Sequence, residues 1–125
     1  MTARLFTNLR GLTLQMGQRG LVITGGLRKE AKLSAIRQRF GVAVEWHEID
    51  SDAQRDVEAI VNRIRSGRVG AVVILNGLMA HKVWNKIVVA CSQHNVPHAT
   101  AGTGGTAAIE QAFNELERRL TRTES

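Results

Sequence analysis

The segment Gly102-Thr-Gly-Gly-Thr106 is the part of the sequence best suited to hold an anion. Glycines let the backbone approach a ligand closely, and a run with helical periodicity follows directly. The start of that helix would offer free N–H groups and a positive dipole end, with hydroxyls from Thr103 and Thr106 as further donors. Neither a Walker loop nor a dinucleotide fingerprint is present, because no Lys-Ser or Lys-Thr follows and the segment comes after the last strand-like run. A flexible turn capped by Thr106 is the alternative interpretation.

A second glycine pair, Gly25-Gly26, ends the first strand-like run and is followed by Arg28 and Lys29. Cations at a helix start oppose the helix dipole, a small cost that an anion bound between them would offset. The alternative is that both charges simply point into water. The predicted ligand-binding and anion-binding residues are Gly25, Gly26, Arg28, Lys29, Asn76, Gly77, Gly102, Thr103, Gly104, Gly105 and Thr106.

Histidine and cysteine are residue types that can ligate haem or a metal ion, and the candidates in this sequence are His47, His81 and Cys91. Cys91 follows His81 by ten residues, nearly three helical turns, and no pair has close ligand spacing. Histidines that hydrogen-bond locally are therefore favoured over a metal or haem site. No Ser-His-Asp arrangement is recognisable, so the sequence favours a protein that is not an enzyme.

The net charge of +6 is unevenly distributed along the chain. Residues 1–40 hold eight basic residues against one acid, giving +7, whereas residues 41–125 hold nine against ten, giving −1. A positive end on a near-neutral body suggests nucleic acid or an acidic protein surface as the partner, unless the basic residues merely solvate a helix face. The predicted partner-binding residues are Arg4, Arg10, Arg19, Arg28, Lys29 and Lys32.

Four strand-like runs alternate with four helix-like runs, and these elements must position the loops. The strand-like runs are 20–24, 42–49, 69–75 and 96–101. The first and third are continuously apolar, as in strands covered on both faces of a parallel sheet. Four apolar stripes with helical spacing lie between and after them, at Leu33, Ile36 and Phe40, at Val57, Ile60, Val61 and Ile64, at Val83, Trp84, Ile87, Val88 and Cys91, and at Ile109, Ala112, Phe113, Leu116 and Leu120.

This alternation predicts one three-layer α/β domain over residues 20–125, Rossmann-like or flavodoxin-like, with right-handed crossovers and helices on both faces. We expect four parallel strands in the order 2-1-3-4. Ligands bind such sheets at the carboxyl ends of the strands near the switch in strand order, here between the first and third strands. Residues 1–19 are expected to form a basic N-terminal arm, which could serve in dimerisation, or an extra strand.

Several short motifs occur in a familiar order along residues 20–100. They are Leu21-Val-Ile-Thr-Gly-Gly26, a basic helix, Trp46-His47, Val72-Val-Ile-Leu-Asn76, Ala80-His81, Cys91 and Val96-Pro97. The chain thereby resembles a bacterial family of small Rossmann-like domains, the domain-of-unknown-function family twenty-three twenty-five. Ala80 replaces the serine of the family's Ser-His pair, and Asn76 stands where an acid is more usual. The resemblance implies the fold and marks Gly25, Gly26, His47, His81 and Cys91 as candidates for a shared site.

These features favour a non-enzymatic, cytoplasmic binding or regulatory domain, expected as a homodimer, whose basic N-terminal face contacts nucleic acid or an acidic partner. One cysteine, no recognisable secretory signal and no membrane-length apolar run underlie the expected location. Three alternatives stay open: a nucleotide or phosphate sensor at the switch-point crevice, a haem or metal protein using His47, His81 or Cys91, and a structural or assembly protein.

Overall fold

The computed structural model describes residues 20–40 and 44–124, and within these ranges it contains one four-stranded sheet. The strands are β1 (Gly20–Thr24), β2 (Val44–His47), β3 (Val69–Ile74) and β4 (His98–Thr100). All pairs are parallel and the order is β2-β1-β3-β4, which confirms the predicted topology. In the register, Leu21 lies opposite Val44 on one side and Ala71 on the other.

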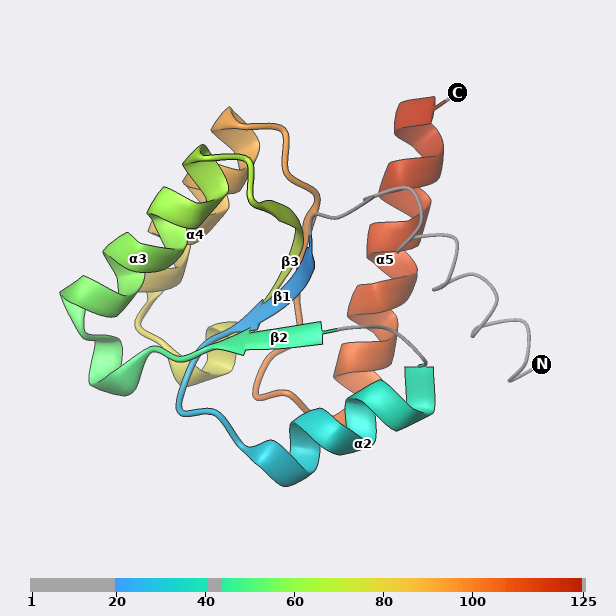
Figure 1. The fold of residues 1–125 in the computed structure, drawn as a ribbon, viewed down its shortest axis with the longest axis horizontal. Coiled ribbons are helices and arrows are strands. Elements are labelled where there is room, and N and C mark those ends of the chain that lie inside the picture. Colours follow the sequence, from blue (N-terminus) through green and yellow to red (C-terminus); the bar gives the residue numbers. More distant parts are fainter. Residues whose placement is uncertain (1–19, 41–43, 125) are drawn as a thin grey trace.

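Helices cover both faces of this sheet, as the sequence predicts. They are α2 (Glu30–Phe40), α3 (Gln54–Arg65), α4 (His81–Gln93) and α5 (Thr106–Glu124), with short 3₁₀ turns η1 (Asp50–Asp52) and η2 (Asn76–Leu78). Figure 1 shows α3 and α4 side by side on one face, and α2 and α5 on the other. The predicted arm or extra strand of residues 1–19, with Arg4, Arg10 and Arg19, lies outside the described residues.

The sheet separates two apolar cores, because successive strand residues point to opposite faces. Ala71 and Val73 of β3 pack with the α2 and α5 residues, whereas Val72 and Ile74 pack with those of α3 and α4. All six residues of β3 are buried, which explains its continuously apolar sequence. No helix in the described part of the chain is long and apolar enough to cross a membrane.

The apolar stripes predicted for α3 and α4 include residues that these helices do not fully bury. Val57, Ile60, Ile64, Ile87 and Cys91 are buried, as expected. Val61, Trp84 and Val88 are only partly buried, and Val89, outside the predicted stripe, is 43% exposed. Part of the apolar surface of this helical layer therefore faces outward.

Cys91 lies in the core between the sheet and α4, and burial raises the pKa of its thiol to about 12. Because the thiolate is the reactive form, we expect native protein at pH 8 to resist modification by dithiobis(nitrobenzoic acid), with full labelling once the chain is unfolded in guanidinium chloride. Fast stoichiometric labelling of the folded protein would show instead that this thiol is accessible.

Candidate functional site

The loop that follows β1 is held by protein contacts on both sides. Toward β2, the Trp46 indole N–H donates to the Gly25 carbonyl at 3.2 Å, and the Ile49 N–H donates to the Gly26 carbonyl at 3.0 Å. Toward β3, a Cβ on Gly25 would lie 2.9 Å from the Cβ and 3.0 Å from the carbonyl oxygen of Leu75. The glycine pair thus permits close packing between two loops of the chain.

Gly26 is packed in the same way, against the 3₁₀ turn η2. A Cβ on Gly26 would come within 2.9 Å of Leu78 Cδ1, and the methyl group of Met79 lies 3.1 Å from the Cβ position of Gly25. Both glycines have positive φ, 128° and 66°, which residues with a Cβ rarely adopt. The side chains of Leu78 and Met79 therefore lie where the sequence predicted a ligand, between the first and third strands.

Asn76 and Gly77 join the loop after β3 to the loop after β4. The Asn76 Oδ1 accepts a hydrogen bond from the Gly102 N–H at 3.0 Å, and the Gly77 N–H donates to the Gly102 carbonyl at 2.9 Å. A Cβ on Gly77 would lie 2.9 Å from both the Gly102 carbonyl carbon and the Thr103 methyl group. Like Gly25 and Gly26, these two predicted ligand-binding residues have an evident structural role.

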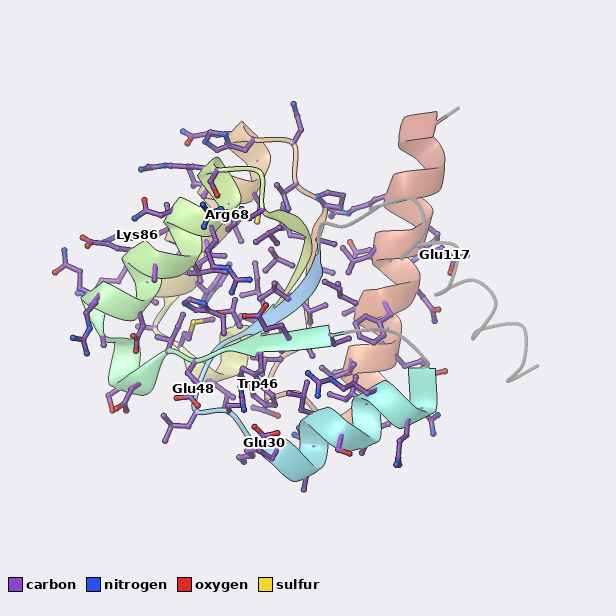
Figure 2. All side chains as sticks on the ribbon, in the orientation of Figure 1. Glu30, Trp46, Glu48, Arg68, Lys86 and Glu117 are labelled. Atoms are coloured by element: carbon purple, nitrogen blue, oxygen red, sulfur yellow. The ribbon has the colours of Figure 1, made fainter. Side chains whose placement is uncertain are left out.

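The cations after Gly26 stand at the start of a helix, as expected: Lys29 directly precedes α2, and its carbonyl accepts a hydrogen bond from the Leu33 N–H at 3.0 Å. Helix α2 begins at Glu30, an acid that suits a helix N-terminus, and Arg28 forms an ion pair with Glu30. Figure 2 shows Glu30 at the start of α2 and Glu48 beyond the end of β2. This end of the sheet therefore carries acids close to its cations, and Glu30 offsets part of the unfavourable dipole interaction that a bound anion was expected to offset.

Part of the predicted anion-binding set does come together, between α2 and α5. A pocket of about 300 Å³ is lined by Lys32, Arg39, Gly104, Thr106 and three apolar residues of the same helices. Lys32 Nζ lies 3.6 Å from the position of a Gly104 Cβ, beside the first turn of α5, whereas Gly105 has nothing within 4 Å of its Cβ position. Of the predicted anion-binding positions, those in this pocket leave room for a small phosphate, whereas side chains fill the β1–β3 crevice.

The three predicted haem or metal ligands lie in three different environments. His47 Nε2 lies 3.0 Å from the Asp56 carbonyl oxygen, so it carries the proton, and Nδ1 accepts from Arg63 at 3.3 Å. The His81 ring packs edge-on against Trp84, with centroids 4.7 Å apart, while Cys91 is buried about 15 Å further along α4. Over residues 20–40 and 44–124, no group of three His, Cys, Asp or Glu side chains is arranged to hold a metal ion.

Arg63 of α3 also forms a two-pronged ion pair with Glu45 of β2, with both N···O distances at 2.9 Å. This hydrogen bonding holds the pKa of Glu45 below its ordinary value of 4.5. A carboxyl whose pKa is lowered by folding stabilises the fold above its unfolded pKa, and that contribution is lost as the pH falls through the folded pKa.

We therefore expect Glu45→Gln to lower the free energy of unfolding at pH 7 but to have little effect near pH 3. The Glu45 side chain is 57% exposed, so the loss should be no more than about 1 kcal/mol. Urea denaturation at several pH values measures this. An equal loss at both pH values would contradict the assigned ion pair.

Among the residues that the structure describes, the largest group of unpaired cations lies on the α3–α4 layer, where the sequence did not predict a site. Within the described ranges, no hydrogen-bond or ion-pair partner is found for the side chains of Arg55, Arg65, Arg68, Lys82 and Lys86. Figure 2 shows Lys86 and Arg68 on this side of the molecule and Glu117 on α5 at the other. We call the exposed surface of α3, α4 and Arg68 the basic helical face.

A groove of about 800 Å³ runs between α3 and α4 along this face. Its lining combines charged, amide and apolar side chains, among them Asn62, Arg65, Lys82, Lys86, Val61 and Val89. The α4 residues Lys82, Lys86, Val89 and Gln93 recur at helical spacing. That spacing was the feature of the sequence that could have indicated this face. Counting charge over residues 41–125 concealed it, because this segment also contains ten acids: four on α5, four between Glu45 and Asp52, and two on α3, Asp56 and Glu58.

Comparisons with known proteins support the fold alone. No protein-family model and no curated protein matches the chain, so the resemblance to the domain-of-unknown-function family stays a prediction. Among solved structures, a mutant laminin-binding adhesin from Streptococcus agalactiae superposes with a TM-score of 0.50 at 11% sequence identity. The match covers 97% of this chain and 45% of the adhesin, so the chain spans less than half of that protein's length.

Proposed function

We propose that this domain is a binding module that docks an acidic protein partner on its basic helical face. The main support for this proposal is the set of five unpaired cations on that face. Among the described residues that line the groove, Glu58 is the single acid. A cluster of unpaired positive charges produces a local electrostatic potential that attracts anionic groups and accelerates their association.

The placement of Lys82 and Lys86 favours a functional role over a stabilising one. Both lie in the first two turns of α4, whose first turn contains no acid. Lys82, in the first turn, opposes the helix dipole at a cost of about 0.3–1 kcal/mol, whereas Lys86 lies beyond the first turn, where this effect falls off. Acidic groups of a partner would offset this cost on binding.

The basic segment around α2 offers fewer free charges than its composition suggests. Arg28 pairs with Glu30, and Arg39 pairs with Glu110 at 3.1 Å. Arg37 donates two hydrogen bonds to the Val44 carbonyl, at 3.0 and 2.7 Å. Among the described residues of this segment, Lys29 and Lys32 remain as free cations, against five on the basic helical face.

A protein fits the groove better than a nucleic acid. Single-stranded nucleic acids bind through aromatic side chains on which bases stack, and the groove lining includes no aromatic residue among the residues described. Valine side chains between the cations instead suit the apolar side chains of a protein. The cytoplasmic location and the homodimer remain predictions alongside this proposal.

Fluorescence anisotropy with labelled polyglutamate, and with an oligothymidylate of equal charge as the comparison, tests the proposal. We expect polyglutamate to bind, with an affinity that falls as salt rises. Preferential binding of the oligothymidylate would favour nucleic acid as the partner. Binding of neither anion would contradict the proposal.

A further inference from the structure

Resting on the proposed function, we infer that the partner segment is an acidic amphipathic helix of about three turns that lies along the α3–α4 groove. Its apolar residues would contact Val61 and Val89, and its acids would face Arg65, Lys82 and Lys86.

The first support is the distribution of side chains along the groove. Val89 is 43% exposed and Val61 is partly buried, one from each of the two helices that form the walls. Lys82 and Lys86 lie toward the start of α4, and Arg65 lies at the end of α3. The two helices run parallel because each connects parallel strands. Cations therefore stand near both ends of the groove, with the valines between them.

The second support is the absence of backbone groups that an extended peptide needs. A bound strand pairs its N–H and C=O groups with a sheet edge, whereas the interior backbone of α3 and α4 is already hydrogen-bonded within each helix. A helix satisfies its own backbone and presents only side chains to such a groove. From Lys82 to Gln93 the groove wall spans about 16 Å, which matches about three turns.

Charge argues against a second copy of this chain on the same face. A two-fold symmetric dimer contact places the same surface patch on both subunits. Lys82 and Lys86 of each copy would then approach cations of the other, and like charges placed together across an interface cost several kcal/mol. An acidic partner removes this repulsion.

Two labelled peptides of about 14 residues and identical Leu, Glu and Ala composition test this inference. In one, leucines recur at i, i+3 and i+7; in the other, they are scattered around the helix. We expect the amphipathic peptide to bind wild-type protein at least about tenfold more tightly than the scattered one. Val61→Ser/Val89→Ser should abolish that preference while leaving the salt-sensitive binding of polyglutamate unchanged.

Both valines are partly exposed, so the double variant should fold, and circular dichroism checks this. The single variant Val89→Glu gives a second measurement: its carboxylate should weaken amphipathic peptide binding more than Val89→Gln does. Equal affinity for both peptides, with polyglutamate still bound, would overturn the helix inference and leave the acidic-partner proposal standing. If no acidic probe binds, both fail. Formation of a dimer that Lys82→Glu disrupts would also overturn the inference, in favour of a second copy.

Discussion

Replacing Gly25 with alanine should lower the free energy of unfolding by about 3 kcal/mol or more. The φ of Gly25 is +128°, and forcing a residue with a Cβ into such backbone costs about 1–3 kcal/mol. The new Cβ would lie 3.0 Å from the Leu75 carbonyl oxygen and 2.9 Å from the Leu75 Cβ, and overpacking of this kind adds about 1–3 kcal/mol. Urea denaturation followed by Trp fluorescence measures the loss.

Gly20→Ala is the matched control for Gly25→Ala. Gly20 has no positive φ and nothing within 4 Å of its Cβ position, so its replacement should change stability by less than about 0.5 kcal/mol. If Gly25→Ala were as stable as Gly20→Ala, the loops after β1 and β3 would not be tightly packed. The crevice between them would then return as the preferred ligand site.

The double charge reversal Lys82→Glu/Lys86→Glu should weaken polyglutamate binding by about 100-fold. Each change replaces an attraction with a repulsion, and the pair is expected to cost about 2–3 kcal/mol of binding free energy. The same change should leave the thermal stability unchanged or slightly raised, because the acid introduced at position 82 complements the N-terminal end of the α4 dipole. Anisotropy titrations and thermal unfolding measure the two effects.

Lys29→Glu/Lys32→Glu is the control, since it changes the net charge by the same amount on α2. We expect it to weaken polyglutamate binding less than about threefold, through the long-range field alone. A larger loss from the α2 pair than from the α4 pair would move the interface to the basic segment that the sequence first suggested.

The fold was predictable because buried parallel strands and amphipathic helices leave plain periodic patterns. The continuous apolar run of β3 and the Val57–Ile60–Ile64 spacing of α3 each follow directly from burial on one or both faces. The expected order β2-β1-β3-β4 is confirmed, and right-handed crossovers then place helices on both faces of the sheet. The exact strand ends were not predictable: the fourth strand was expected over 96–101, and β4 spans only His98–Thr100.

The site was less predictable, because the same residue types serve packing and binding. A glycine pair after a strand permits the close approach of a phosphate or of another loop, and only the positions of Leu75 and Leu78 distinguish the two for Gly25 and Gly26. Asn76 similarly binds the Gly102 backbone. The sequence shows the cations of the basic helical face, but only the folded structure shows that no acidic side chain among the described residues lies close enough to pair with them.

Mapping polyglutamate on the ¹⁵N-labelled protein by NMR chemical-shift perturbation tests the basic helical face most directly. We predict that the amides shifting on titration belong to α3 and α4, above all around Arg65, Lys82, Lys86 and Val89. The shifts should vanish in Lys82→Glu/Lys86→Glu and persist in Lys29→Glu/Lys32→Glu. Shifts centred on Lys32, Gly104 and Thr106, with α3 and α4 unaffected, would contradict binding at the basic helical face and place the anion site in the pocket between α2 and α5.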